Sequence, residues 1–193
     1  MIRIARETDV PEILAIYAPY VRHTTVSFEY DVPTEAEFYV RFREITVRFP
    51  WLVWEEDGEI LGYAYACLPF ERAAYRWCAE PSIYLKPEAR GRGIGKRLYH
   101  ALEALLEYLG YQMLFALITG ENEDSIRFHE KMGYRIAGEL THSGYKCDRW
   151  LSVFWMEKQM DIVQNSVVFP IKWSAIVQDD QKICDILYNL SLS

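Results

Sequence analysis

The chain has 193 residues and a net charge of −7, and 51% of its residues are hydrophobic. This length and composition favour a single globular domain, and the acidic balance argues against a nucleic-acid-binding protein, for which a basic surface is expected. The four cysteines and four histidines show no spacing typical of a metal site, and no apolar run reaches the length of a membrane span. We therefore expect a cytoplasmic protein that binds no metal, nucleic acid or membrane.

The first part of the chain predicts one strand followed by two helices. Residues 2–5 alternate between apolar and polar side chains, as in a strand with one buried face. The first helix is expected to begin after Thr8 or Asp9, either of which can act as its N-cap. The second helix is expected to begin after Thr34, where Glu37 completes a capping box.

Three strands are predicted next. Residues 50–68 contain two strand-like runs joined at Asp57 and Gly58, a pair that favours the tight turn of a hairpin. Residues 76–85 form another strand-like run, with Pro81 in its middle. Because proline has no N–H to donate, we expect a bulge or a loss of pairing at this position.

The second part of the chain predicts a helix, a strand, a helix and two strands. The amphipathic pattern over residues 94–110 ends at a glycine, as helices often do. The continuous apolar run over residues 112–119 is typical of a strand buried on both faces. A helix capped by Asn122 is expected to end at Gly133. Residues 134–160 predict two strands around a glycine-rich connection.

This order of elements predicts an α/β fold in which helices cover a mixed sheet. The domain is expected to span residues 1–160. Residues 161–193 form an extension with a strand-like segment, 166–177, and a helix-like segment, 181–190. The extension is too apolar for a solvated tail, so we expect it to pack on the core or on a second subunit.

The stretch from Arg90 to Lys96 joins a predicted strand to a predicted helix and combines three glycines with three basic side chains. Glycines allow the backbone to approach a ligand closely, and the amides at a helix start can bind an anion. The spacing excludes a Walker loop and fits a dinucleotide-binding fingerprint poorly. The stretch therefore indicates a phosphate site, with a flexible exposed turn as the alternative.

The motif Arg90-x-x-Gly93-x-Gly95 resembles the pyrophosphate-binding signature of the GNAT N-acetyltransferase superfamily. With the segments around it, up to about Met160, the chain resembles the phosphinothricin and methionine sulfoximine acetyltransferase branch. The resemblance implies the GNAT acyl-CoA N-acyltransferase fold, in which helices lie on both faces of a central, mostly antiparallel sheet with a splayed strand pair. It also implies acetyl-CoA as co-substrate and a homodimer.

The resemblance also assigns contacts with the cofactor. It implies that backbone groups of Ile83, Tyr84 and Leu85 run beside the pantetheine arm. Asn122 and Ser125, at the start of the next helix, are expected at the far end of that arm or near the thioester. The residues implied around the pyrophosphate are Arg90, Gly91, Arg92, Gly93, Ile94, Gly95 and Lys96.

Acetyl transfer to an amine requires a base for the ammonium and an acid for the leaving thiolate. Glu80, beside Pro81, matches the family's glutamate. We expect burial to raise its pKa, or a water molecule to relay the proton, because an ordinary carboxylate is too weak a base. His129 shares a helix face with Asn122 and Ser125. The resemblance implies that it acts as the acid toward the thiolate, and the ordinary pKa of a histidine suits proton exchange near neutral pH. The alternatives are a surface carboxylate for Glu80 and a packed side chain for His129.

An amino-acid substrate brings a carboxylate that needs a cation. Arg72 and Tyr75 match the arginine and tyrosine of the branch's substrate pocket, and Phe28 with Tyr84 is expected to form an apolar wall. The alternatives are a solvated loop for Arg72 and the core for the two rings. Herbicide-detoxifying members have a lysine where this chain has Phe70. We therefore favour methionine sulfoximine, methionine sulfone or a similarly less anionic amino acid over phosphinothricin.

The predicted function is acetyl-CoA-dependent N-acetyltransfer to the α-amine of a small amino acid or analogue, of the phosphinothricin, methionine sulfoximine or methionine sulfone type. Two alternatives stay open. One is acetylation of a polyamine or a protein amine, against which Arg72 argues because a polycation needs an acidic pocket. The other is a non-catalytic CoA-binding protein with the same fold.

Overall fold

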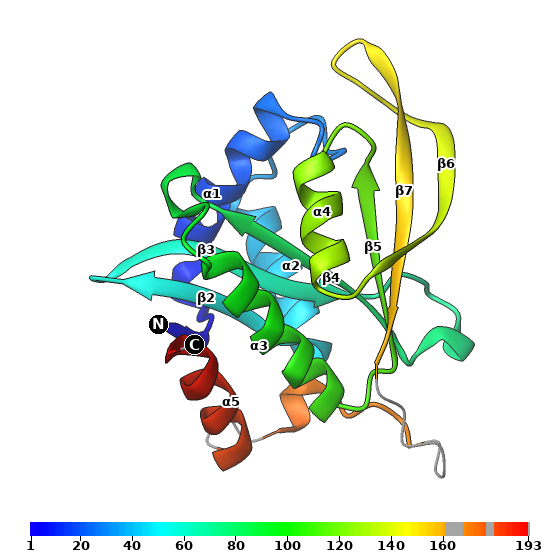
Figure 1. Cartoon of the computed structure of the whole chain (residues 1–193). Helices are drawn as coiled ribbons and strands as arrows, with labels where there is room; N and C mark the ends of the chain where they lie inside the picture. The colour runs from blue at the N-terminus through cyan, green and yellow to red at the C-terminus, as the bar shows by residue number, and fades with distance from the viewer. Residues whose placement is uncertain (161–167, 177–179, 193) are drawn as a thin grey trace.

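The computed structural model describes residues 1–160, 168–176 and 180–192, and within these ranges a seven-stranded sheet lies between layers of helices (Figure 1). The strand order is β1-β2-β3-β4-β5-β7-β6. Neighbouring strands are antiparallel except β4 and β5, which are parallel. The strands are β1 Ile2–Ile4, β2 Trp51–Glu56, β3 Glu59–Cys67, β4 Cys78–Leu85, β5 Met113–Thr119, β6 Arg135–Lys146 and β7 Arg149–Gln159. The helices are α1 Val10–His23, α2 Glu35–Arg48, α3 Ile94–Tyr108, α4 Glu123–Lys131 and α5 Gln181–Leu192.

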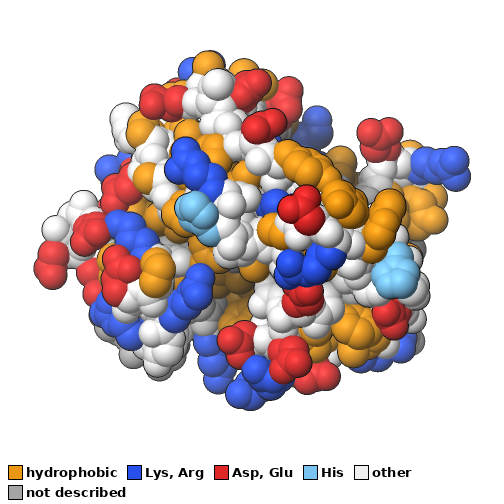
Figure 2. Space-filling view, turned by 90° about the horizontal axis from the view of Figure 1, so that it is seen from above, with side chains coloured by type: hydrophobic (Ala, Val, Ile, Leu, Met, Phe, Trp, Pro, Cys, Tyr) orange, Lys and Arg blue, Asp and Glu red, His pale blue; other side chains and the backbone are white. Residues whose placement is uncertain are grey.

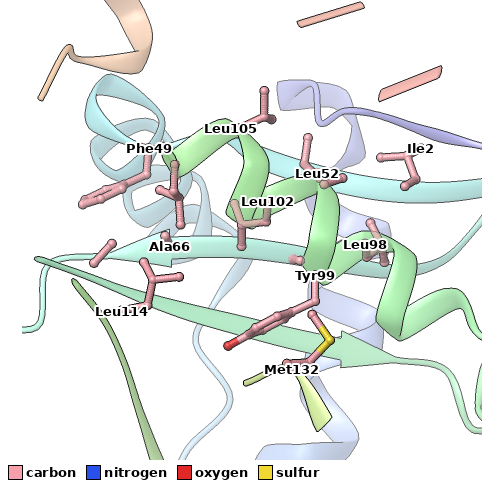
Figure 3. Close-up of a cluster of buried hydrophobic side chains, with 14 of the residues drawn as sticks. Ile2, Phe49, Leu52, Ala66, Leu98, Tyr99, Leu102, Leu105, Leu114 and Met132 are labelled. Carbon is pink, nitrogen blue, oxygen red and sulfur yellow. The ribbon is translucent and has the colours of Figure 1, made fainter. Parts of the chain in front are cut away.

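The helices α3 and α4 cover one face of the sheet, and α1 and α2 cover the other (Figure 1). On the α3 side, Leu98, Leu102 and Leu105 are fully buried in one cluster (Figure 3). Ile94, the first residue of α3, is buried with them. The chain leaves the helix at Gly110, which has a φ of 93° that only glycine adopts easily. Burying each leucine stabilises the fold by about 2 kcal/mol, so this stripe fixes α3 against the strands that form the site.

The two N-terminal helices begin in different ways. Thr34 and Glu37 form the predicted capping box, with the Thr34 N–H donating to the glutamate at 2.7 Å and the Glu37 N–H donating to the threonine Oγ1 at 3.3 Å. The predicted side-chain cap of α1 is wrong. The Asp9 carboxylate is instead paired with Arg3 at 2.6 Å, because a 3-10 turn, Glu7–Asp9, precedes the helix and turns that side chain toward β1.

Two strand predictions are wrong in detail. In β5, Ala116 is buried toward α3 and α4, but Leu117 on the opposite face is 42% exposed. The reason is that α1 and α2 lie over the β1–β4 half of the sheet (Figure 1). The turn between β6 and β7 is made by Cys147 and Asp148, which both have positive φ, whereas Gly144 lies inside β6.

The C-terminal extension contacts the core. In α5, Ile183 is buried against the α3 cluster, and the Ser191 hydroxyl accepts a hydrogen bond from the Ile2 N–H at 2.8 Å. Residues 168–176 contain a 3-10 turn, Trp173–Ala175, and no strand, so the strand prediction is wrong for these described residues. The rest of that segment lies outside the described residues. Among the described helices, none is both long and apolar enough to cross a bilayer.

Candidate active site

The strands β4 and β5 separate part-way along their length (Figure 1). Their parallel pairing reaches Ala79 opposite Leu114, and beyond it the strands diverge. Pro81 lies two residues past this point and keeps its register with β3, opposite Ala66. The loss of pairing predicted at the proline therefore falls on the β5 side, where it leaves a gap in the sheet.

One edge of β4 faces this gap. The Lys86 N–H donates to β3, whereas the Leu85 N–H and C=O both bond the Tyr20 hydroxyl, at 3.2 and 2.5 Å. Successive residues of a strand direct their backbone groups to opposite sides. The backbone of Ile83 therefore faces the gap with one donor and one acceptor, while the backbone of Tyr84 faces β3.

The glycine-rich junction leads from β4 into α3. Gly91 and Gly93 have φ values of 73° and 77°, which other residues rarely adopt, and a Cβ at either position would meet nothing within 4 Å. At Gly95 a Cβ would lie 3.2 Å from the Leu85 Cδ1. The first two glycines thus shape an exposed run of amides at the N-terminus of α3, and the third lets the helix lie close to β4. Such a helix start suits an anion.

The basic side chains of the junction differ in their surroundings. Arg92 is paired with Glu56 at 2.6 Å. Arg90 donates to the Tyr20 hydroxyl at 2.9 Å, with its guanidinium 5.4 Å from the ring centroid. Lys96 is exposed. On the face drawn in Figure 2, acidic and basic side chains are interspersed, so attraction for an anion is local to the junction.

A narrow cleft of about 70 Å³ lies between the diverging strands. This volume is below the roughly 300 Å³ of ordinary ligand pockets, so the cleft can hold only the reacting end of a ligand. Glu80 lines it, half-buried, and burial raises the pKa of this carboxyl as a base requires. The lining residues are Val26, Glu80, Pro81, Ser82, Ile83, Tyr84, Ala116, Leu117, Ile118, Thr119, Asn122, Ser125 and His129.

His129 also lines the cleft, but its ring nitrogens are bound within the protein. Nδ1 lies 2.8 Å from the Ser125 carbonyl oxygen and Nε2 lies 2.9 Å from the Tyr99 hydroxyl. Because a carbonyl only accepts, Nδ1 carries the hydrogen of the neutral ring. Burial lowers the pKa of His129 to about 4. The expectation of a pKa suited to proton exchange near neutral pH is therefore wrong, since this side chain is 5% exposed.

The start of α4 brings two further predicted residues to the cleft. The Asn122 side chain caps the helix by accepting from the Ser125 N–H at 3.3 Å, and the Ser125 hydroxyl lies 3.4 Å from Nδ1 of His129. Thr119 is a further lining residue that was not expected from the sequence, and its Oγ1 is buried there without a hydrogen bond to any described residue. Such a group is open to a ligand, and its position at the end of an apolar strand gave no signal.

Of the residues expected at the acceptor amine, Tyr84 lines the cleft and Phe28 does not. Phe28 is exposed and packs over β6, where a Cβ at Gly144 would lie 2.1 Å from its ring. Lys146, at the end of the same strand, is buried and donates to the carbonyl of Ser27 at 2.6 Å. The loop that carries Phe28 is therefore fixed beside the cleft, and its Val26 reaches the lining.

Arg72 and Tyr75 are not among the residues that line the cleft. Tyr75 packs against Phe70 with its ring tilted and the centroids 4.4 Å apart, and Phe70 stacks on Trp155 of β7 at 5.5 Å. Arg72 lines a separate cavity of about 320 Å³ that shares no residue with the cleft lining. Other cations on that cavity are Arg48, Arg76 and Lys172. The structure thus brings Glu80, His129, Asn122, Ser125 and Tyr84 together and leaves Arg72, Tyr75 and Phe28 outside.

Residues 2–155 match the acetyltransferase (GNAT) domain family. The chain belongs to the GNAT acetyltransferase family. The sequence-based predictions of the GNAT fold and of an N-acetyltransferase are thereby confirmed.

Two curated relatives and one solved structure define the branch of this GNAT chain. The phosphinothricin N-acetyltransferase of Alcaligenes faecalis is 37% identical over 162 residues, covering 83% of this chain and 82% of the relative. The L-methionine sulfoximine/L-methionine sulfone acetyltransferase of Pseudomonas paraeruginosa is 35% identical over 168 residues, covering 83% and 94%. A phosphinothricin acetyltransferase from Sinorhizobium meliloti, solved in complex with AcCoA, superposes with a TM-score of 0.83 at 36% identity, covering 89% of this chain and 92% of that one. The predicted branch is therefore confirmed.

Proposed function

We propose that this GNAT protein uses acetyl-CoA to acetylate the α-amine of a small amino acid or analogue, of the phosphinothricin, methionine sulfoximine or methionine sulfone type. The observation that carries the proposal is the continuous path from the glycine-rich start of α3, along the free edge of β4, to Glu80 in the cleft. The named activities of the relatives support the acceptor class.

The residues along this path suit acetyl-CoA in chemical type. The amides from Gly91 to Lys96 would bind the pyrophosphate, because a helix start with positive-φ glycines presents unbonded N–H groups to an anion. The Ile83 N–H and C=O would pair with the amides of the pantetheine arm as a neighbouring strand does. The buried Thr119 hydroxyl and the Ser125 hydroxyl would meet the thioester end.

Glu80 is the base that we propose for the acceptor ammonium. Burial raises the pKa of Glu80, which brings its basicity closer to that of the amine. Over the whole transfer the nitrogen loses two protons and the sulfur gains one. His129 is neutral at pH 7 because its pKa is about 4, so it holds no spare proton for the thiolate and can only pass one on.

The acceptor is an amino acid in this proposal because Arg72 offers a bidentate partner for a carboxylate. The proposed apolar contacts are Tyr84, which lines the cleft, and Phe28 and Tyr75, which like Arg72 lie outside its lining. Phe70 replaces a lysine with a ring that is packed between Tyr75 and Trp155. An anionic side chain such as a phosphinate would therefore lose a cation here, which favours the uncharged side chains of methionine sulfoximine or methionine sulfone.

A cytoplasmic homodimer is the proposed state of the protein. Each of the four cysteines is a free thiol, as is usual in a reducing compartment. A second copy is the proposed cover for the face of β5 and β7 that carries Phe115, Leu117 and Trp155, and it would bring further side chains toward Arg72. Sedimentation analysis tests this state, and a monomer at micromolar concentration would contradict it.

Release of CoA thiol should be measured across a panel of acceptors. Methionine sulfoximine and methionine sulfone are expected to give the highest kcat/KM, phosphinothricin a lower one, and spermidine and a peptide N-terminus none. The control is Glu80→Gln, which should bind acetyl-CoA as the wild type does and lose turnover. Turnover with the peptide or the polyamine alone would overturn the acceptor class. Binding of acetyl-CoA with no turnover on any acceptor would favour a non-catalytic CoA-binding protein.

A further inference from the structure

The cavity that Arg72 lines has features of a ligand site of its own. Its volume is about 320 Å³, and small molecules occupy protein pockets of about 300–1,000 Å³. Its walls come from the C-terminal end of α2, the loop between β3 and β4, the residue that follows α3 by three positions, and the C-terminal extension. It shares no residue with the lining of the cleft, so the path proposed for acetyl-CoA leaves it free.

The C-terminal extension supplies one wall of this cavity, through Phe169 and Lys172 among others. Two contacts hold that wall against the core. The Ile171 N–H donates to the Leu109 carbonyl oxygen at 2.9 Å, and Phe169 stacks on Trp77 with the ring centroids 5.4 Å apart. Figure 1 shows the segment, in orange, beside the C-terminal end of α3. The segment lies beyond the part of the chain that matches the GNAT domain, so this wall is an addition to the domain.

The cavity is strongly cationic. Four cations line it, Arg48, Arg72, Arg76 and Lys172, against the single carboxylate of Glu71. Within the described residues, none of the four forms an ion pair with a carboxylate. The chain as a whole has a net charge of −7, so this excess of positive charge is local. A hollow lined by charges of one sign raises the local concentration of the opposite ion.

Two of the guanidinium groups are held in place by neutral partners. Arg48 donates through Nη2 to the Arg76 carbonyl oxygen at 3.0 Å and through Nε to the Tyr111 hydroxyl at 3.2 Å. Arg76 donates through Nε to the Ala73 carbonyl oxygen at 2.9 Å, and its guanidinium lies 4.6 Å from the centroid of the Phe169 ring. These contacts order both groups without neutralising their charge. Cations that are already ordered lose less entropy when an anion binds.

We propose that this cavity binds a compact polyanion, a small molecule that carries two or more carboxylate or phosphate groups. The planar guanidinium group suits both, because its parallel N–H donors match two oxygens of a carboxylate or a phosphate. A single anionic group would leave most of the cations uncompensated, which favours several such groups on one molecule. The volume, at the lower end of ligand pockets, favours a molecule much smaller than a coenzyme. The rings of Phe70 and Phe169 line the cavity as well and would cover the carbon skeleton.

Arg72 connects this site with the proposed acetyltransfer. It lines the cavity and is also the proposed partner of the acceptor carboxylate. A polyanion held by Arg48, Arg76 and Lys172 therefore competes with the acceptor for the Arg72 guanidinium. It should raise the KM of the acceptor and leave the KM of acetyl-CoA unchanged. This consequence rests on the proposed function, whereas binding of the polyanion does not.

Isothermal titration of the full chain tests the site, with citrate as the carboxylate probe and pyrophosphate as the phosphate probe. CoA is present at saturation so that the start of α3 is occupied. At least one probe should bind with a Kd below about 1 mM. Arg76→Gln and Lys172→Gln should each weaken that binding about tenfold, because each removes a charge-assisted hydrogen bond. Lys131→Gln is the matched control, since it removes the same charge from an exposed lysine of α4, and it should bind as the wild type does.

Each outcome decides a separate point. A Kd above about 1 mM for both probes with the wild type overturns the proposal. Binding that Arg76→Gln and Lys172→Gln weaken no more than Lys131→Gln also overturns it, because the probe is then held elsewhere. A bound probe that leaves the KM of the acceptor unchanged refutes the competition through Arg72 alone. No turnover on any acceptor would instead reject the proposed function, and the titrations would still decide the site.

Discussion

The substitution Gly93→Ala tests how much the exposed backbone amides of residues 91–96, at the start of α3, contribute to acetyl-CoA binding. Gly93 has a φ of 77° and a Cβ there would meet nothing within 4 Å, so the substitution introduces backbone strain without a clash. Holding alanine in this left-handed conformation costs about 1–2 kcal/mol. Gly58, in the β2–β3 turn, has a φ of 80° and equally open surroundings. Gly58→Ala is therefore a control with the same strain outside residues 91–96.

Both variants should lose thermal stability to the same extent. For a chain of this size each kcal/mol shifts Tm by about 2–4 °C, so a loss of about 2–8 °C is expected in each. Only Gly93→Ala should weaken acetyl-CoA binding, by at least about tenfold or 1.4 kcal/mol, because relief of the strain turns the amides away from the pyrophosphate. Isothermal titration with acetyl-CoA measures the difference. If Gly93→Ala binds acetyl-CoA with wild-type affinity while its Tm is lowered as in Gly58→Ala, the proposed pyrophosphate site at the start of α3 is refuted.

Three further predictions concern the cleft and the core. Glu80→Gln should lower kcat by about 100-fold or more. It should also raise Tm at pH 7. Burial raises the pKa of Glu80, so ionisation of this carboxyl destabilises the folded state as the pH rises, and glutamine removes that ionisation. A lower Tm would contradict the raised pKa of Glu80. The pKa of His129 is lowered from 6.5 to about 4, so the free energy of unfolding should fall by about 3 kcal/mol as the pH falls through this window. His129→Asn should lack that pH dependence in thermal melts, and an identical slope would exclude His129 as its source. Leu102→Ala should destabilise the fold by about 2–5 kcal/mol in urea titrations, since the side chain is fully buried, and a loss below 1 kcal/mol would mean that the site collapses around it.

The elements that sequence predicted well are those whose signals are local. The capping box at Thr34, the Asp57–Gly58 turn and the apolar stripe of α3 each specify a structure within a few residues. Pro81 predicted the break in strand pairing for the same reason, because the hydrogen bond that a proline cannot donate is lost at the proline itself. The glycines of the junction predicted its backbone conformation, since the tolerance of a positive φ belongs to each single residue.

The features that sequence did not predict depend on distant neighbours. The open face at Leu117 could not be known from an apolar run, because the run does not reveal how far α1 and α2 extend over the sheet. Asp9 was expected to cap a helix, but Arg3 competes for its carboxylate. The pKa of His129 is set by burial rather than by its position in the motif. Tyr99 looked like one more core side chain, and only its contacts with His129 and Tyr134 distinguish it.

Pro81 has a consequence for how fast a ligand binds. Its nitrogen carries a ring carbon instead of a hydrogen, and that side of the strand faces the gap, so β4 has no N–H there to donate to β5. The free energy of unfolding is already lower by about 1 kcal/mol for each hydrogen bond that β4 and β5 do not form beside the gap. A ligand that enters the gap therefore needs no prior opening of the sheet. Association with acetyl-CoA should follow a single phase whose rate rises linearly with ligand concentration, without a slow conformational step.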